Sequence, residues 1–503
     1  MRQAKRHMDT ININRQKMKR ISIAILMTLF FYTISFAQQK NTSKLTKQIE
    51  TYLTEFEKNG FAGTVLVELD GKKVISKGYG FRNAELKEKN TPNTIFDIGS
   101  LTKQFTAAAI LKLEMQGKLS TSDTITKYFQ NVPIDKSAIT IHDLLRHQSG
   151  LQSNVGEDYD PITETAFLDS LMISPLQFKI GSDFSYSNIG YSLLALIIEK
   201  VSGQTYEQYL YENLWKSSGM ETTGYSRPNF DADLIAIGYG KNYVNWGKPT
   251  EKKWNGNEPY RHLLGNGGIL TTSEDMFKWH KSLLTENVLS IEAKKKLYHP
   301  TIRANENYNA IYAYGWDVSK TNRNTFRVWH NGTNNIFYAD FMRFIDEKTT
   351  LILMSNKTFR GTDQLNFEIA KIIFNKNYKP TIPKTDNEIN QKFTQEIIEI
   401  ILNKGLEEAT LRYKNRLSNT DVLEYLLIRN GYEQLSQNKF DEAIGIFKMN
   451  CIANPNSFNA YDSLGEAYMN KGDKISAIKN YEKSLQLDPT NENAEEMIKK
   501  MKQ

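Results

Sequence analysis

The sequence contains very little cysteine: Cys451 is the one such residue in a chain of 503. A single thiol cannot form an intramolecular disulfide, and it argues against a cysteine-based metal site or a cysteine nucleophile. Proline is also scarce, with 12 residues, and together with only 29 glycines this excludes a collagen-like chain. Hydrophobic residues make up 40% of the chain, which excludes a wholly disordered protein. The length predicts about two to four domains.

The chain also lacks a strong excess of either charge. The formal net charge is +7, but residues 1–37 hold seven basic residues and one acidic residue and so contribute most of it. The remaining body is nearly neutral and gives no electrostatic argument for binding nucleic acid. No segment has the spacing of metal ligands, so we expect neither a nucleic-acid partner nor a bound metal.

One long apolar run lies near the start of the chain, at residues 21–36, directly after three basic residues. The run is short for a membrane-spanning helix, which needs about 20 apolar residues. Ser35 and Ala37 supply the small residues that a signal peptidase requires. Residues 1–37 therefore predict a secretory signal peptide, and we expect an exported protein, periplasmic or secreted, that meets the membrane only through this segment. An uncleaved membrane anchor is the alternative.

The spacing of apolar residues predicts an early hairpin and a late group of strands. Residues 43–58 have the pattern of an amphipathic helix. Residues 63–81 have the strand propensity of a β-hairpin that turns at Asp70-Gly71. Strands return much later in four segments, at residues 312–318, 325–330, 337–344 and 349–355.

This order of elements predicts an α+β fold. Residues 100 to about 290 are mainly helical, and a helix at about 363–375 follows the last strand. Strands divided in this way most economically join one antiparallel sheet, flanked by helices and interrupted by a helical lobe. Strands and helices do not alternate as they do in a parallel Rossmann-type sheet. Thr271 and Glu274 have the spacing of a capping box at the start of a helix in the lobe.

The character of the sequence changes near residue 380. Residues 378–387 carry two prolines among polar residues and predict a linker. Beyond them the sequence repeats with a period of about 34 residues, as in the pairs Gly431 and Gly465, Ala443 and Ala477, and Pro455 and Pro489. This period, with small residues where helices meet and proline at the end of each unit, resembles tetratricopeptide repeats. An ordinary amphipathic helical bundle is the alternative.

These boundaries predict a domain at 38–377 and an all-α repeat domain at 388–503. Glu407-Glu408-Ala409 lies one such period before Asp441-Glu442-Ala443 and indicates a degenerate earlier repeat. Stacked helix pairs form a concave surface, so we expect the repeats to bind a protein or peptide partner. A stabilising appendage to the first domain is the alternative.

A short motif at Ser100 and Lys103 carries the first indication of chemistry. Gly99 allows an abrupt entry into an apolar helix and places Ser100 at its N-terminus. Lys103 lies one helical turn further on the same face, within reach of the hydroxyl. A serine is a poor nucleophile until a base removes its proton, and burial lowers the pKa of lysine so that it can act as that base. Alone the spacing is weak, because an N-cap and a solvated lysine would produce it too.

Two further motifs follow along the chain. Tyr186 and Asn188 lie on a glycine-flanked turn before a second apolar helix, where a phenol can relay a proton and an amide can bind a substrate carbonyl. His330 and Gly332 lie at the end of a predicted strand, where glycine lets another backbone or a ligand approach closely. The backbone N–H of Thr333 would then pair with that of the serine as an oxyanion hole. An ordinary strand-end histidine is the alternative at position 330.

Together these motifs resemble the serine β-lactamase and penicillin-binding-protein superfamily, in the branch of class C β-lactamases, D-Ala-D-Ala carboxypeptidases and esterases. The resemblance covers about residues 45–375 and is reinforced by the segments at 144–151 and 265–269. It implies an antiparallel sheet with a helical lobe, an acyl-enzyme mechanism and no cofactor. It also implies roles for individual residues: nucleophile for Ser100, base for Lys103, proton transfer for Tyr186, and substrate binding for Asn188, His330, Gly332 and Thr333.

One departure from the family pattern bears on the substrate. Established β-lactamases of this branch usually carry Lys-Thr-Gly where this chain has His330-Asn331-Gly332. Histidine with its ordinary pKa of about 6.5 is mostly neutral at pH 7, which weakens the grip on a substrate carboxylate. We therefore expect an exported serine hydrolase acting through an acyl-enzyme on an ester, amide or peptide, including D-amino-acid-containing cell-wall peptide. The alternative is a catalytically inactive penicillin-binding-like scaffold that acts through its repeats.

Overall fold

The structure is a computed structural model that describes residues 42–226, 230–240, 244–252, 259–299, 302–303, 310–357, 361–381, 388–416 and 421–502. The predicted signal peptide lies outside these residues. Among the residues described, no helix combines the length and the apolar character needed to cross a membrane. The chain divides into two compact units, Met1–Pro383 and Lys384–Gln503, which are described separately.

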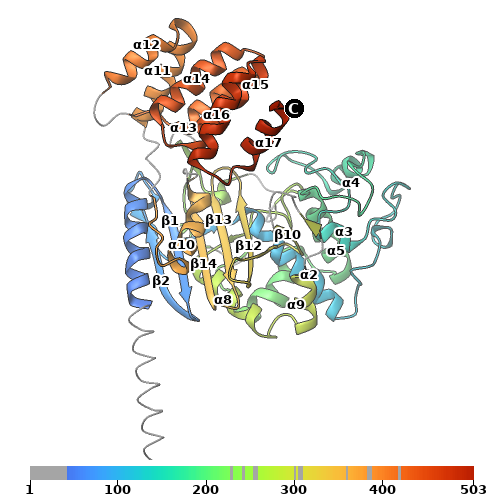
Figure 1. Cartoon of the computed structure of the whole chain (residues 1–503). Helices are drawn as coiled ribbons and strands as arrows, with labels where there is room; N and C mark the ends of the chain where they lie inside the picture. The colour runs from blue at the N-terminus through green and yellow to red at the C-terminus, as the bar shows by residue number, and fades with distance from the viewer. Residues whose placement is uncertain are drawn as a thin grey trace, which may run out of the picture. The chain divides into compact units, whose positions relative to one another are not determined.

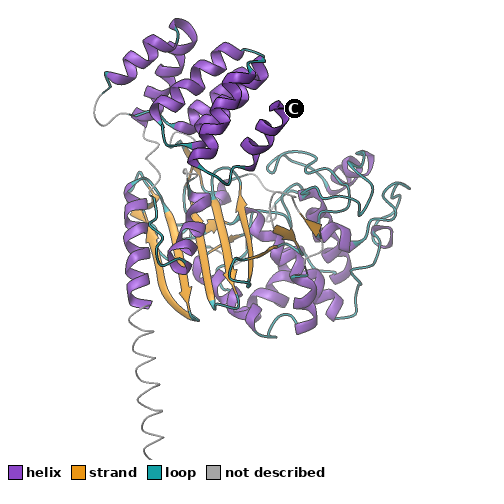
Figure 2. Cartoon of the chain, in the orientation of Figure 1, coloured by secondary structure: helices purple, strands orange, loops and turns teal. Residues whose placement is uncertain are grey.

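The first unit is built on one antiparallel sheet of eight strands (Figure 1, Figure 2). In order across the sheet, the strands are β2 (Lys72–Tyr79), β1 (Gly63–Leu69), β14 (Thr349–Ser355), β13 (Tyr338–Phe344), β12 (Phe326–Thr333), β11 (Asp317–Lys320), β10 (Ala310–Tyr312) and β9 (Ile302–Arg303). The first and last parts of the unit therefore meet within the sheet, where β1 pairs with β14. This arrangement confirms the α+β fold with a single antiparallel sheet.

Local sequence correctly predicts the hairpin of β1 and β2, but it does not predict the break between β10 and β11 near the far edge of the sheet. Asp70 and Gly71 both have positive φ, as the predicted two-residue turn requires. Residues 312–318, predicted as one strand, are instead the end of β10, a turn and the start of β11, and this prediction was wrong. Gly315 has φ +73° in that turn, and a Cβ there would lie 2.9 Å from the backbone oxygen of Lys103. The strand is interrupted because the turn packs against another element.

The sheet is accompanied by helices and by short two-stranded ladders. One helix lies within residues 42–58, and the others are α2 (Thr102–Met115), α3 (Ile141–Leu145), α4 (Glu164–Ile173), α5 (Asn188–Ser202), α6 (Tyr206–Leu210), α7 (Lys216–Ser218), α8 (Ser273–Leu284), α9 (Ile291–Leu297) and α10 (Leu365–Phe374). The ladders join β3 (Phe81–Asn83) to β4 (Glu88–Lys89), β5 (Phe96–Asp97) to β8 (Leu270–Thr271), and β6 (Gly238–Tyr239) to β7 (Asn245–Gly247).

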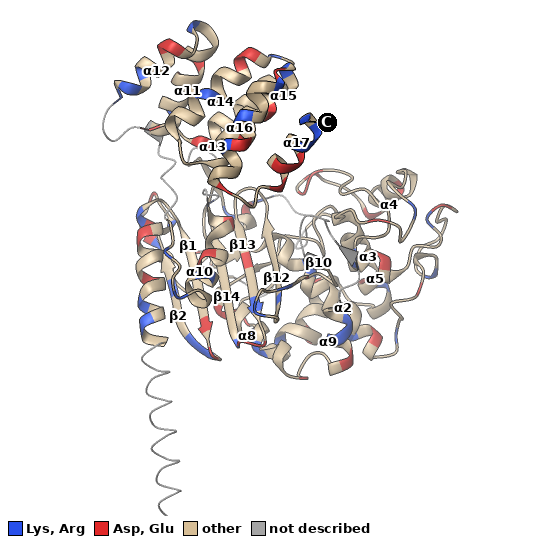
Figure 3. Cartoon of the chain, in the orientation of Figure 1, with Lys and Arg blue, Asp and Glu red and all other residues tan. Residues whose placement is uncertain are grey.

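Each face of the sheet is covered by its own apolar core. On one face, the helix within residues 42–58 and α10 pack on β1, β13 and β14, with Leu53 and Phe56 fully buried. This helix exposes acidic and basic residues along its outer side (Figure 3). On the other face, α2, α5 and α8 form a larger core with the helical lobe. Both faces are therefore buried, which explains why all seven residues of β1 are buried.

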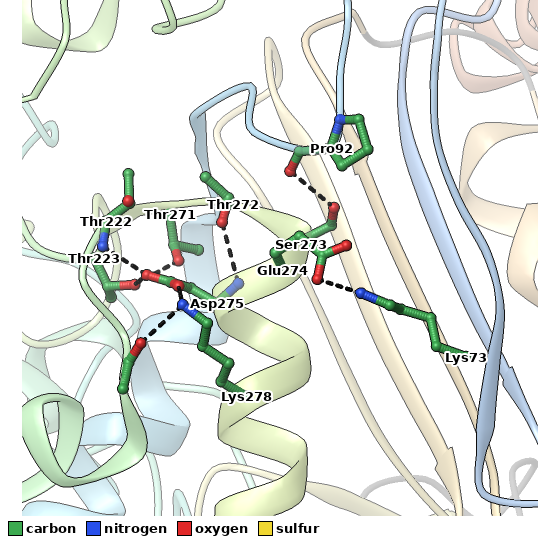
Figure 4. Close-up of polar contacts among 11 residues, drawn as sticks. Lys73, Pro92, Thr222, Thr223, Thr271, Thr272, Ser273, Glu274, Asp275 and Lys278 are labelled. Carbon is green, nitrogen blue, oxygen red and sulfur yellow. Dashed lines mark hydrogen bonds and ion pairs between the residues drawn. The ribbon is translucent and has the colours of Figure 1, made fainter.

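The N-terminus of α8 joins the helical lobe to the sheet (Figure 4). The sequence predicted a cap from Thr271 to Glu274, but the N-cap is Thr272, whose hydroxyl accepts a hydrogen bond from the backbone N–H of Asp275. Glu274 instead accepts a bond from Lys73 on β2 at 2.6 Å. The predicted cap was therefore wrong by one residue, because the glutamate pairs with the strand and not with the start of its own helix.

In residues 388–416 and 421–502, the second unit has three helix pairs and a final helix. The pairs are α11 (Glu388–Lys404) with α12 (Leu406–Lys414), α13 (Glu424–Ser436) with α14 (Phe440–Ala453), and α15 (Phe458–Lys471) with α16 (Lys474–Leu487), and α17 spans Glu492–Lys502. Gly431 faces the ring of Phe447, and one sequence period later Gly465 faces Tyr481 in the same way. The repeated contact gives the period its physical meaning, since only glycine leaves room for the ring.

Cys451 lies within α14. Its thiol is partly buried and donates toward the backbone oxygen of Ala460. Burial raises the pKa of the thiol to about 12, so the reactive thiolate is scarce at neutral pH.

Candidate active site

The predicted nucleophile lies in a tight turn between a strand and a helix. β5 ends at Asp97, one turn of 3₁₀ helix spans Gly99–Leu101, and α2 begins at Thr102. Gly99 has φ +49°, a left-handed conformation that glycine adopts at no steric cost. The sequence predicted Ser100 at the start of the α-helix, whereas it lies in the 3₁₀ turn just before it, partly exposed to solvent.

Lys103 extends from the first turn of α2 toward three oxygen atoms. Its Nζ lies 3.0 Å from Ser100 Oγ, 2.8 Å from Asn188 Oδ1 and 2.8 Å from the backbone oxygen of Asn266. These partners come from three different segments of the chain. The i, i+3 spacing therefore produces the contact between serine and lysine that the sequence predicted.

The environment of Lys103 favours the neutral form of its amine. Lys103 is fully buried, and burial lowers its pKa well below the ordinary value, while the charge of Asp158 opposes the shift. A neutral amine has two N–H bonds and one lone pair. The oxygens of Asn188 and Asn266 can only accept, so they take the two N–H bonds. The lone pair then points toward the Ser100 hydroxyl, which is the arrangement that a general base requires.

Tyr186 lies on the other side of the serine, on the turn that precedes α5. Its ring centroid lies 4.7 Å from Lys103 Nζ. Burial raises the pKa of the phenol well above its ordinary value, and the Ser100 hydroxyl, which lowers this pKa, only partly opposes the shift. The His147 ring lies 4.3 Å from the tyrosine ring and restricts its orientation. Tyr186 is therefore a protonated phenol in contact with the nucleophile.

Asn188 is the first residue of α5, which Ser187 caps. Its side-chain oxygen accepts from Lys103, and its Nδ2 donates to Asn154 Oδ1 at 2.9 Å. The sequence predicted this amide as a substrate-binding group. The structure places it beside the lysine, with its N–H face turned to an exposed residue at the edge of the site.

The end of β12 packs backbone to backbone against the nucleophile turn. A Cβ at Gly332 would lie 2.0 Å from the backbone oxygen of Ile98 and 2.6 Å from the backbone nitrogen of Ser100. A Cβ at Gly99 would lie 2.6 Å from the backbone nitrogen of Thr333. Real side chains do not fit at either position, so both glycines are required for the approach. The approach places the backbone nitrogens of Ser100 and Thr333, which the sequence predicted as an oxyanion hole, on two segments in close backbone contact.

His330 is buried against the aromatic side chains of the site. Only 3% of its surface is exposed, and its Nε2 lies 3.0 Å from the Tyr312 hydroxyl. Burial lowers the pKa of His330 to about 3. The imidazole is therefore neutral at physiological pH, and it contributes no positive charge to the cleft.

Sequence reasoning missed several groups that shape the site. The carbonyl of Asn266 orients the lysine, but a backbone oxygen has no sequence signature. Tyr312 and His147 pack around Tyr186. In the sequence analysis, Tyr312 was assigned only to a strand. The aromatic residues that follow it in the sequence, on either side of the turn glycine, could have indicated that this segment packs within a core. In the described part of the chain, no three His, Cys, Asp or Glu side chains are grouped as a metal ion would require.

Comparison with known proteins agrees with this geometry. A family profile described as Beta-lactamase matches residues 46–372. The chain belongs to the β-lactamase family. Its β-lactamase domain is followed by a helical repeat region, in which a Tetratricopeptide repeat profile matches residues 458–491. The β-lactamase family comprises serine hydrolases and penicillin-binding proteins, as the sequence motifs indicated.

Two similar proteins and one similar solved structure illustrate how this chain compares with other members of the family. Protein flp of Staphylococcus aureus (strain MW2) is 29% identical over 370 residues, which are 70% of this chain and 71% of that protein. Penicillin-binding protein 4* of Bacillus subtilis (strain 168) is 29% identical over 326 residues, 62% of this chain and 72% of that protein. The octameric penicillin-binding protein homologue from Pyrococcus abyssi shares the fold with a TM-score of 0.58 and 24% identity, over 71% of this chain and 81% of that one.

Proposed function

We propose that this chain is a serine hydrolase that forms an acyl-enzyme on Ser100. The observation that carries the proposal is the fully buried amine of Lys103, 3.0 Å from the serine oxygen. Two carbonyl oxygens take the N–H bonds of the neutral amine and leave its lone pair for the serine proton. An inactive scaffold has no need of such an arrangement, which argues against the alternative function.

The proposed reaction begins when Lys103 accepts the proton of Ser100 and the serine oxygen bonds to the substrate carbonyl carbon. The negative charge that develops on the carbonyl oxygen is stabilised by the backbone N–H groups of Ser100 and Thr333. When the intermediate collapses, the bond to the leaving group breaks, and Tyr186 relays the proton from Lys103 to that group. A water molecule then gives one proton to Lys103 and attacks the acyl carbon. The bond between that carbon and the serine oxygen breaks, the acid product leaves, and the proton returns through Lys103 and Tyr186 to Ser100.

The proposed substrates are esters, amides or peptides, including cell-wall peptides that contain D-amino acids. Support comes from the relative named as a penicillin-binding protein and from the neutral, buried His330. Without a cation at this position, a substrate carboxylate contributes little binding energy. We therefore expect neutral esters and amides to react faster than penicillins. This order of preference distinguishes the chain from β-lactamases that carry lysine there.

The test is covalent labelling of the full chain with a fluorophosphonate, followed by proteolysis and mass spectrometry. We expect an adduct on the peptide that contains Ser100, no adduct in Ser100→Ala, and labelling at least about 100-fold slower in Lys103→Met. Ser436→Ala is the matched control, because Ser436 and Lys439 repeat the same spacing in the second unit. If fluorophosphonate, penicillin and an activated ester all leave the wild-type serine unmodified, the proposal is wrong and the scaffold is favoured.

Two further parts of the proposal concern location and partners. Export rests on the basic and apolar pattern of residues 1–37, and N-terminal sequencing of the protein from the periplasm or medium tests it. Partner binding rests on the three stacked helix pairs of the second unit. Protein that ends near residue 380 should keep its esterase rate but lose partners recovered in pull-downs with the full chain.

A further inference from the structure

A buried carboxylate lies beneath the nucleophile turn and is not used by the proposed reaction. Asp97 is the last residue of β5 and is 2% exposed. Its Oδ1 accepts the backbone N–H of Gly99 at 2.7 Å, and its Oδ2 accepts Nδ2 of Asn334 at 3.1 Å. The first bond is local, whereas the second joins residues that are 237 positions apart in the sequence.

Each of the two bonded segments carries one of the backbone donors of the oxyanion hole. Gly99 directly precedes Ser100, and Asn334 directly follows Thr333. Asn334 is itself held in place, because its Oδ1 accepts the backbone N–H groups of residues 336 and 337, at 3.1 and 2.8 Å. A further hydrogen bond joins it to Tyr159. One carboxylate therefore connects both donor segments.

We propose that Asp97 is a positioning residue that sets the separation of the Ser100 and Thr333 N–H groups. The inference rests on the proposed function, because it assigns a cause to the geometry of that site. Donors stabilise a developing oxyanion only when both lie about 2.7–3.1 Å from it. A displacement of about 1 Å in such a site lowers the rate by about 100-fold. Asp97 does not touch the substrate; it acts through the two backbone segments.

The hydrogen bond between Asp97 and Asn334 explains why asparagine cannot replace the aspartate. In Asp97→Asn, one side-chain oxygen still accepts from Gly99, but an N–H group then faces Nδ2 of Asn334. Asn334 cannot turn its amide over to compensate, because its oxygen is already engaged by two backbone N–H groups. The substitution therefore breaks the bond to the strand segment and leaves the bond to the nucleophile turn in place.

The experiment compares full-length Asp97→Asn and Asn334→Ala with a control carboxylate. Asp275 is equally buried, at 2% exposure, and accepts the backbone N–H of Thr222 at 2.7 Å at the N-terminus of α8 (Figure 4). Asp275→Asn therefore matches the chemistry without touching the site. For each variant we would measure kcat and KM for a neutral ester, inhibition by a phenylboronic acid, and the melting temperature. The boronate forms a tetrahedral adduct on serine, so its affinity reports on the oxyanion hole.

We expect Asp97→Asn and Asn334→Ala to lower kcat and boronate affinity together by about 10- to 100-fold, with KM changed by less than about threefold. Asp275→Asn should lower the melting temperature while kcat and boronate affinity stay at the wild-type values. The inference is overturned if both site variants lose stability but keep boronate affinity, or if only KM changes. Asn334→Ala keeps the test valid should Asp97→Asn not fold. A wild-type protein that hydrolyses no ester and binds no boronate would instead overturn the proposed function.

Discussion

The neutral state of Lys103 can be tested by placing one negative charge beside it. Asn188→Asp keeps the shape of the side chain and converts a neutral acceptor, 2.8 Å from Nζ, into an anionic one. The exposed Asn154 can turn its amide to donate to the new carboxylate, so the variant is expected to fold. The charge favours the protonated ammonium and raises the pKa of Lys103, which removes the base at neutral pH.

The size of the effect follows from the distance. Two unit charges 2.8 Å apart interact by about 6 kcal/mol at an effective dielectric constant of about 20. If solvent and the desolvation of the new carboxylate offset half of this, about 3 kcal/mol remains, equal to about two pH units. We therefore expect the acid limb of the pH profile for acylation to move upward by at least about two pH units in Asn188→Asp.

The assay is the second-order rate of fluorophosphonate labelling, measured from pH 5 to pH 10 on the full chain. Asn188→Ala is the control, since it removes the same acceptor without adding charge and should slow labelling at every pH without moving the limb upward. We expect the wild-type protein to reach its plateau near neutral pH, because burial lowers the pKa of Lys103 well below its ordinary value. If Asn188→Asp and Asn188→Ala share one acid limb with the wild type, Lys103 is not the base that sets the rate.

Three further substitutions test other parts of the structure. Gly332→Ala would place a Cβ 2.6 Å from the backbone nitrogen of Ser100, so we expect acylation to fall at least about 100-fold in labelling rate. Glu68→Ala removes the buried acceptor 2.9 Å from His280 Nε2, and we expect a loss of about 3 kcal/mol in the free energy of unfolding by urea at pH 7. Gly431→Ala would place a Cβ 2.4 Å from an aromatic ring of α14, so the second unit should lose about 1–3 kcal/mol of stability by urea titration while labelling stays unchanged.

The outcomes that contradict these expectations are equally specific. Unchanged labelling in Gly332→Ala would show that strand β12 does not contribute to the oxyanion hole. Burial raises the pKa of Glu68, but the bonds from His280 and Lys281 outweigh it and lower the pKa to about 2. Its stabilisation is therefore present above about pH 4.5 and lost as the pH falls toward 2. A stability difference between wild type and Glu68→Ala that persists at pH 2 would contradict the pairing. Slower labelling in Gly431→Ala would show that the repeats influence the active site.

The parts of the fold that local sequence determines could be predicted. The hairpin at Asp70-Gly71 needs only two residues with positive φ, and the period of the repeats marks the places where helices of one pair touch. Strands β13 and β14 were found because all seven residues of each are buried in the sheet. The interruption at Gly315 was not found, since its cause is the backbone of Lys103, which lies far earlier in the chain. The spacing of apolar residues indicates which positions of a segment are buried. It does not indicate where a distant segment packs against them.

The residues of the candidate site also divide into those that local sequence predicts and those that it does not. Ser100 and Lys103 could be predicted because one helical turn brings them together, whatever the rest of the fold does. Asn266 lies 163 residues beyond the lysine and contributes only a backbone oxygen, so no residue type indicates its role. Asp97 was overlooked for a different reason. An acidic residue two positions before a glycine is common in turns. The role of Asp97 becomes visible only when the end of the strand that packs beside it is known.

The proposed base and the proposed oxyanion hole both depend on close contacts between segments that are distant in sequence. The turn at Gly315 packs against the backbone of Lys103, and the end of β12 packs against the backbone of Ser100. Lys103 thus loses its solvation where the helical lobe meets the sheet, which is also where the two backbone donors converge. A substitution that opened this junction would admit water to the amine and separate the donors at once. Activity should therefore be lost more steeply than stability, and opening the junction with denaturant below the unfolding midpoint should abolish labelling before the helical signal changes.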